Sequence, residues 1–176
     1  MNEDFYWFLV KYRNESNMSG FKIDKENNKV SVSPANSCFV WGMGIFMAGI
    51  GAFLITGGEV FWGFVSVAMG LMVIALITKC TVFDIEKKEV RRVYAYFVET
   101  ASIKEDWITS YHVTAQYING VFKGYIFDLQ YMPPSSSTEN MMKGLTAFKT
   151  MEEIQRFREV ITRIRLEMKL LGNPTN

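Results

Sequence analysis

The chain has few of the residues that carry metal-dependent or acid–base chemistry. Its 176 residues include one histidine and two cysteines, too few for a structural zinc site, which needs four ligands. A single histidine without a nucleophile motif gives no basis for a Ser-His-Asp or Cys-His arrangement. His112 falls on the polar face of an alternating segment, which predicts a solvated side chain. We therefore expect a non-enzymatic protein with no metal and no cofactor.

An excess of either charge is also missing. Lys and Arg number 19 and Asp and Glu 18, for a net charge of +1. Such a chain has no overall field that would attract nucleic acid. No glycine-rich phosphate loop follows a predicted strand, because Gly42, Gly44, Gly49 and Gly51 lie inside an apolar run. We expect neither nucleic acid nor a small-molecule substrate as a partner.

Charge is almost absent from residues 38–78, where Glu59 is the only charged side chain. The segment Thr56-Gly57-Gly58-Glu59 divides this run into residues 38–56 and 60–78. At helical rise each stretch is about 28 Å long, close to the roughly 30 Å hydrocarbon core of a bilayer. The pattern predicts a two-helix transmembrane hairpin over residues 38–79. A buried helical pair is the alternative, which the lack of charge on every face disfavours.

Basic residues on both flanks of the run, and none in its turn, predict an orientation. Both termini should be cytoplasmic, in an integral membrane protein with two spans, in the plasma or inner membrane if the source is bacterial. Small residues recur within the run and favour close helix packing in the membrane, or contact with another membrane protein. These residues are Gly44, Ala48, Ala52, Ser66 and Gly70.

Residues 1–37 form a separate N-terminal segment in this interpretation. Phe5, Phe8, Leu9 and Tyr12 share one helical face, which suits either an interfacial helix or a helix packed on the rest of the protein. Residues 21–32 alternate around a polar turn and predict a β-hairpin.

Beyond residue 79 the apolar period changes to two, which is typical of strands. Strands are predicted at 81–86, 90–97, 107–117, 125–131 and 145–149. A helix follows, because Thr150 and Glu153 form a capping-box pattern ahead of a single apolar stripe. The stripe consists of Ile154, Phe157, Ile161, Ile164, Met168 and Leu171.

This order of elements resembles the bacterial pleckstrin-homology-like membrane proteins. The similarity lies in the apolar hairpin followed by the segments at 81–88, 104–111 and 148–153. It implies an α+β membrane protein, in which a transmembrane hairpin precedes a PH-like antiparallel β-barrel or sandwich capped by a C-terminal amphipathic helix. Residues 80–176 would be that cytoplasmic domain. The resemblance implies a membrane-anchored scaffold, with no catalytic residues to carry over.

Basic residues after the apolar run are the candidate lipid-headgroup site. Lys87, Lys88, Arg91 and Arg92 lie within reach of an anionic leaflet, although a charged turn that obeys the positive-inside rule also explains them. The leading hypothesis is a membrane-anchored scaffold or protein-interaction module. The alternatives are an anionic-lipid-responsive module that uses the basic hairpin, and an accessory subunit of a larger membrane complex. Membrane lipids and either a protein partner or a second copy are the expected partners.

Overall fold

The computed structural model describes residues 1–16, 20–33, 38–77, 79–94 and 98–171, except for the side chains of 38–41 and 74–77. It consists of two compact units. The larger, which we call the β-rich unit, comprises Met1–Ala35, Cys80–Arg92 and Glu99–Asn176. The smaller, the helical-hairpin unit, comprises Asn36–Lys79 and Val93–Val98.

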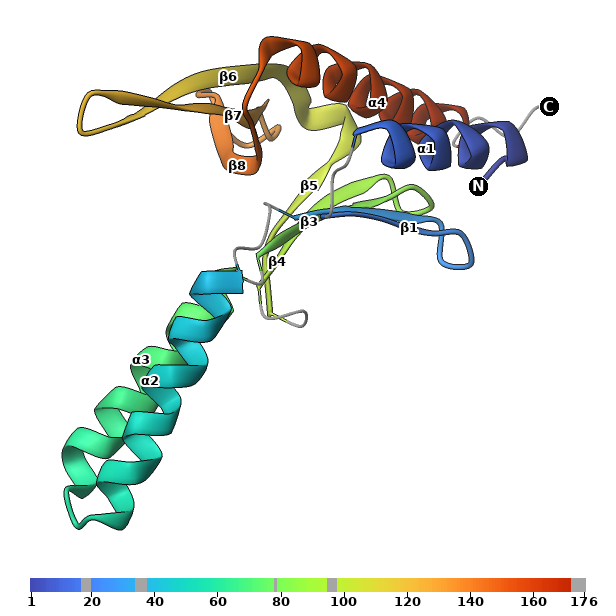
Figure 1. The fold of residues 1–176 in the computed structure, drawn as a ribbon. Coiled ribbons are helices and arrows are strands. Elements are labelled where there is room, and N and C mark those ends of the chain that lie inside the picture. The colour runs from blue at the N-terminus through green and yellow to red at the C-terminus, as the bar shows by residue number, and fades with distance from the viewer. Residues whose placement is uncertain (17–19, 34–37, 78, 95–97, 172–176) are drawn as a thin grey trace. The chain divides into compact units, whose positions relative to one another are not determined.

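The described elements follow one another in the chain as shown in Figure 1. The helices are α1 (Glu3–Ser16), α2 (Cys38–Thr56), α3 (Val60–Ile77), the short 3-10 helix η1 (Glu105–Trp107) and α4 (Met151–Leu170). The strands are β1 (Phe21–Asp24), β2 (Lys29–Val32), β3 (Cys80–Asp84), β4 (Glu89–Tyr94), β5 (Val98–Lys104), β6 (Ile108–Ile118), β7 (Val121–Tyr131) and β8 (Asn140–Phe148).

Two sheets form the β-rich unit, and both keep the strands in chain order. One has the order β1-β2-β3-β4-β5 and the other β6-β7-β8. In the first sheet β2 pairs antiparallel with β3, and Val32 lies opposite Thr81. The residues between these partners include α2 and α3. The helical hairpin is therefore inserted between two neighbouring strands, and residues 21–32 belong to the same sheet as residues 80–104.

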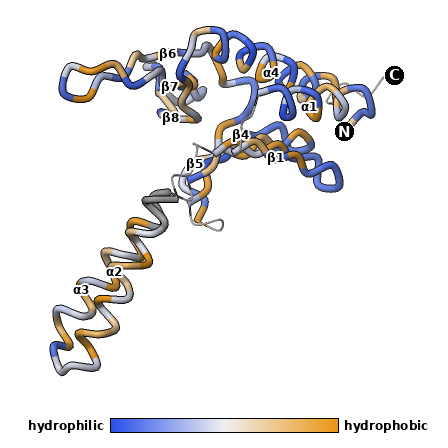
Figure 2. The backbone as a smooth tube through the Cα atoms, in the orientation of Figure 1, coloured by the Kyte–Doolittle hydropathy of each residue, from blue (hydrophilic) through white to orange (hydrophobic). Residues whose placement is uncertain are grey.

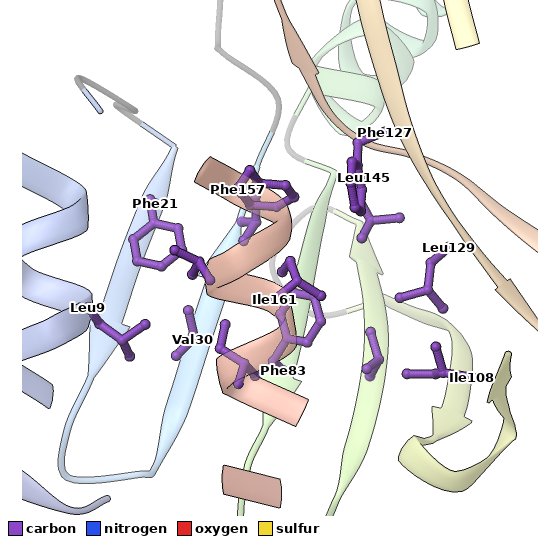
Figure 3. Packing of buried hydrophobic residues seen from close by; sticks show 14 of the residues in the cluster. Leu9, Phe21, Val30, Phe83, Ile108, Phe127, Leu129, Leu145, Phe157 and Ile161 are labelled. Atoms are coloured by element: carbon purple, nitrogen blue, oxygen red, sulfur yellow. The ribbon is translucent and has the colours of Figure 1, made fainter. Parts of the chain in front are cut away.

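Large apolar side chains from both sheets, α1 and α4 fill the core of the β-rich unit. Figure 3 shows Phe157 and Ile161 of α4 among side chains such as Phe83 and Phe127. The Phe157 ring centroid lies 5.0 Å from that of Phe127 in an edge-to-face contact, an arrangement that aromatic pairs favour. Residues from the first helix join them, because α1 buries Phe5, Leu9 and Tyr12. The sequence suited either an interfacial helix or a helix packed on the rest of the protein, and in the structure α1 is packed on the rest of the β-rich unit.

The helix α4 forms where the sequence predicts it. The Thr150 hydroxyl accepts a hydrogen bond from the Glu153 amide at 3.2 Å, and the Glu153 carboxylate accepts from the Thr150 amide at 3.1 Å. The predicted capping box is confirmed. The apolar stripe is buried as far as Met168. Leu171, the last predicted member, follows the helix and is exposed.

The helical-hairpin unit packs through small residues. A Cβ atom added at Gly70 would lie 2.7 Å from the Gly44 carbonyl oxygen and 2.9 Å from the Ala48 nitrogen. The two backbones are therefore in direct contact along α2 and α3. Larger apolar residues such as Phe46 and Phe53 are exposed instead, and Figure 2 shows hydrophobic residues along both helices.

Within the described part of the chain, no helix combines the length and the apolar character needed to cross a membrane. This finding contradicts the predicted transmembrane hairpin over residues 38–79. It also contradicts the membrane-protein fold class and the localisation as a two-span integral membrane protein with cytoplasmic termini. The sequence interpretation relied on the composition of the whole apolar run, whereas the helices that form have 19 residues in α2 and 18 in α3, each short of the roughly 20 residues that a span needs. Over the residues that the structure describes, the fold is α+β, with four α-helices and two sheets.

Candidate functional site

The structure separates the four basic residues that were predicted to bind a lipid headgroup. Arg91 is held by carboxylates, with its Nη2 atom 2.6 Å from Asp84 Oδ2 and its Nη1 atom 3.3 Å from Glu99 Oε2. Arg92 is buried in the β-rich unit. Lys87 and Lys88 lie on the turn between β3 and β4. The four residues therefore do not form a single basic surface.

Asp84 accounts for this separation. Its side chain is buried, and it accepts hydrogen bonds from Arg91 and, at 3.1 Å, from the Lys87 amide. The Nζ atom of Lys29 lies 3.8 Å from the same carboxylate. Lys88 adopts a φ of 55°, the left-handed conformation that a tight turn requires. Asp84 thus holds the side chain of Arg91 and shapes the turn that carries Lys87 and Lys88.

Lys87 and Lys88 line an open cleft of about 510 Å³ at this turn. We call it the basic cleft. Its lining residues are Lys87, Lys88, Lys104, Glu105, Asp106 and Lys169. They come from the β3–β4 turn, the end of β5, η1 and the last turn of α4. The Glu105 amide donates to the Lys88 carbonyl oxygen at 2.9 Å, so the turn and η1 are joined by a backbone hydrogen bond.

Glu105 is the buried acidic residue of the basic cleft, and Arg165 neutralises it. The Arg165 Nε atom donates to Glu105 Oε1 at 2.9 Å, while Nη2 donates to the Ile108 carbonyl oxygen at 3.0 Å. Burial lowers the pKa of Arg165, but hydrogen bonds and charge interactions with Tyr111 and Glu105 outweigh it, so the pKa is raised overall. Arg165 keeps its charge, and its contacts fix α4 to η1 and β6. Lys169 Nζ lies 3.7 Å from the same carboxylate.

Sequence reasoning missed Lys104 and Lys169 as members of a site. They are far apart in the chain, and only the fold brings them to the turn that carries Lys87 and Lys88. Lys169 lies in the last turn of α4. A cation is common at that position because the C-terminal end of a helix carries a partial negative charge, so the position of Lys169 did not by itself indicate a binding site.

Four of the five small residues predicted to pack helices lie at the contact between α2 and α3. Gly44 and Gly70 are buried, next to Ala48. The Ser66 hydroxyl donates to the Met47 carbonyl oxygen on the facing helix at 2.9 Å. Ala52 is exposed and does not belong to this group. The small-residue faces of α2 and α3 are therefore used for the contact between these two helices.

A second feature is the exposed apolar end of the β6–β7 hairpin, which we call the apolar tip. It consists of Tyr117, Ile118, Val121 and Phe122, which are 63, 50, 57 and 43% exposed. Asn119 and Gly120 form the turn with φ angles of 51° and 76°, as an Asn-Gly hairpin turn requires. The rings of Tyr117 and Phe122 are in contact, with centroids 5.6 Å apart.

Other kinds of site have less support. In the ranges that the structure describes, no three His, Cys, Asp or Glu residues lie together as a metal site would need. His112 is exposed on β6, as the sequence predicted. No protein-family model and no curated protein matches the chain. The basic cleft and the apolar tip are therefore two separate candidate sites of the β-rich unit.

Proposed function

We propose that the β-rich unit is a protein-binding module that uses the apolar tip as its contact surface. The observation that carries this proposal is the exposure of four neighbouring large apolar side chains at the end of one hairpin. Scattered single apolar residues are common on protein surfaces, whereas grouped exposed ones indicate an interaction site. Here Tyr117 lies opposite Phe122 and Ile118 opposite Val121 at the end of the hairpin. Tyrosine and other aromatic residues are also enriched at the centres of protein interfaces.

The strand β6 favours a polypeptide as the partner. It lies at the edge of its sheet, so one row of its backbone groups can pair with an added strand. The strand carries no Asp, Glu, Lys or Arg, the residues that commonly discourage such pairing. A partner that supplies an extended segment could use both the edge and the apolar side chains at its end. Lipid offers no matching row of backbone groups.

This proposal retains the protein-interaction role of the leading sequence hypothesis, without the membrane anchor. The scaffold function implied by the resemblance to pleckstrin-homology-like proteins is compatible with it. The hypothesis of an accessory subunit has less support, because it relied on small-residue faces that α2 and α3 use against each other.

Photo-crosslinking in the cells that produce the protein tests the proposal. A photoreactive phenylalanine analogue replaces Ile118 in the full chain, and a matched position, Thr138, is exposed but lies outside the tip. We expect a discrete protein adduct from position 118 that is absent from position 138. Phe122→Asp in the same chain should abolish the adduct, because a charge is placed in the apolar contact. Equal labelling at both positions, or an adduct with lipid alone, would refute the proposal.

A further inference from the structure

We propose that the basic cleft is a binding site for a phosphate group, in a ligand that is either a soluble phosphorylated molecule or a phospholipid headgroup. The site is separate from the apolar tip, so this inference does not depend on the proposed protein partner. It differs from the sequence hypothesis in its residues, because Lys104 and Lys169 join Lys87 and Lys88 in place of Arg91 and Arg92.

The charge of the cleft is the first argument. Four of its six lining residues are lysines. Glu105 does not balance them, because its single carboxylate lies 2.9 Å from Arg165 Nε and 3.7 Å from Lys169 Nζ and is shared between these two cations. Asp106 is exposed at the rim. Like charges held around one small volume repel each other, and a bound anion relieves this repulsion.

The type of cation is the second argument. A lysine ammonium is a compact charge with three donors, which suits phosphate as a set of point contacts. The lysines come from three separate segments, and a tetrahedral phosphate presents oxygens in several directions to receive them. A single carboxylate is better matched by the planar fork of arginine, and the two arginines of the predicted site are turned to Asp84 and Glu99 or buried.

The surroundings of the cleft are the third argument. Its volume of about 510 Å³ lies within the range of roughly 300–1,000 Å³ typical of small-ligand sites, so it admits more than a bare ion. The C-terminal end of α4 contributes a partial negative charge that opposes an anion. Lys169, in the last turn of that helix, offsets this charge. The Lys104 Nζ atom lies 5.9 Å from the centre of the Trp107 ring, which positions its ammonium beside η1.

Calorimetric titration of the full chain with pyrophosphate, at constant ionic strength, tests the site. The test variant is Lys87→Gln/Lys104→Gln, because among the described residues neither lysine forms an ion pair that its loss would break. The matched control is Lys123→Gln/Lys149→Gln, which removes the same charge from exposed positions outside the cleft. Thermal unfolding of all three proteins shows whether the variants are folded.

We expect saturable binding by the natural sequence and the control, and a loss of about tenfold or more in affinity in the test variant, equivalent to about 1.4 kcal/mol. A parallel measurement compares phosphatidylcholine vesicles with and without phosphatidic acid, to identify the source of the phosphate. Extra binding to phosphatidic acid that the test variant loses, without pyrophosphate binding, assigns the site to a lipid headgroup. Absence of binding to both probes, or equal loss in test and control variants, would overturn the proposal.

Discussion

The two units of this protein distribute their apolar side chains in opposite ways. In the β-rich unit the large residues are inside, and Phe83, Phe127 and Phe157 are completely buried. In the helical-hairpin unit the large residues are outside, where Phe53 is 77% and Phe61 71% exposed. Glycine and alanine occupy the contact between α2 and α3 instead.

The two units therefore obtain their cohesion from different sources. The β-rich unit buries large apolar surfaces, so removal of a side chain leaves a cavity. The helical hairpin depends on close approach of two backbones, so addition of even one methyl group separates them. Deletion of atoms should therefore damage the first unit, and addition of atoms should damage the second.

The largest effect is expected from removal of the helical hairpin. Its exposed apolar surface should drive association of the full chain in plain buffer. Val32 and Thr81 are paired, so replacing residues 34–79 by Asn-Gly leaves Ser33 and Cys80 positioned to continue this ladder through a two-residue turn. We expect the shortened chain to fold and to sediment as a monomer, while the full chain sediments as larger assemblies. A full chain that is monomeric in the same buffer would contradict this expectation.

The next effect concerns the core of the β-rich unit. Phe157→Ala should reduce the free energy of unfolding by about 3–5 kcal/mol, because the side chain is fully buried between Phe127 and Phe148. Leu170→Ala on the same helix is the control, since Leu170 is 60% exposed, and it should change stability by less than about 0.5 kcal/mol. Urea unfolding measures both. A change in association state with an unchanged urea midpoint would instead indicate that α4 forms a coiled coil.

A smaller effect is expected from Tyr12, which α1 contributes to the same core. Burial raises the pKa of its hydroxyl from the usual 10 to about 12. The folded state therefore retains the proton at a pH where the unfolded chain has lost it, so stability is full below pH 10 and falls as the pH rises toward 12. The difference in unfolding free energy between the natural sequence and Tyr12→Phe should shift by roughly 2–3 kcal/mol across that interval. Urea unfolding at pH 9 and pH 12 measures the shift, and equal pH dependence in both proteins would show that Tyr12 is not the cause.

Local patterns in the sequence predicted much of the β-rich unit. Alternation indicated most of β6 and β7, and the Thr150–Glu153 pair marked the start of α4. The strand β5 was missed, because Ile103 is its only fully buried apolar residue and its remaining residues show no clear period. The strand predicted at 145–149 omitted the start of β8, which begins at Asn140 and buries Met142. Strands of this kind are specified by their neighbours in the sheet and not by their own residues.

The candidate site was less predictable than the fold. The sequence placed Lys87, Lys88, Arg91 and Arg92 in one group because they are close in the chain. The pleat separates neighbouring side chains to opposite faces of a strand, which places Arg91 beside Asp84 and buries Arg92. The partners of Lys87 and Lys88 come from β5 and α4, and no local pattern indicates such a contact. The membrane assignment was wrong for a related reason, since it relied on the composition of a chain segment and not on the length and apolar character of the helices that form there.

The smallest effect tests the contact between α2 and α3 with a single methyl group. Gly70→Ala places a Cβ atom 2.7 Å from the Gly44 carbonyl oxygen, which forces the backbones apart and should cost about 1–3 kcal/mol. Gly49→Ala is the matched control on α2, because its new Cβ atom meets nothing within 4 Å. Alanine is the better helix former, so this change should stabilise α2 by about 0.5–1 kcal/mol. Amide hydrogen exchange in α2 and α3 should accelerate in the first variant and slow in the second, while exchange in the β-rich unit stays unchanged. The same response to both substitutions would mean that helix propensity, and not backbone contact, decides the stability of this unit.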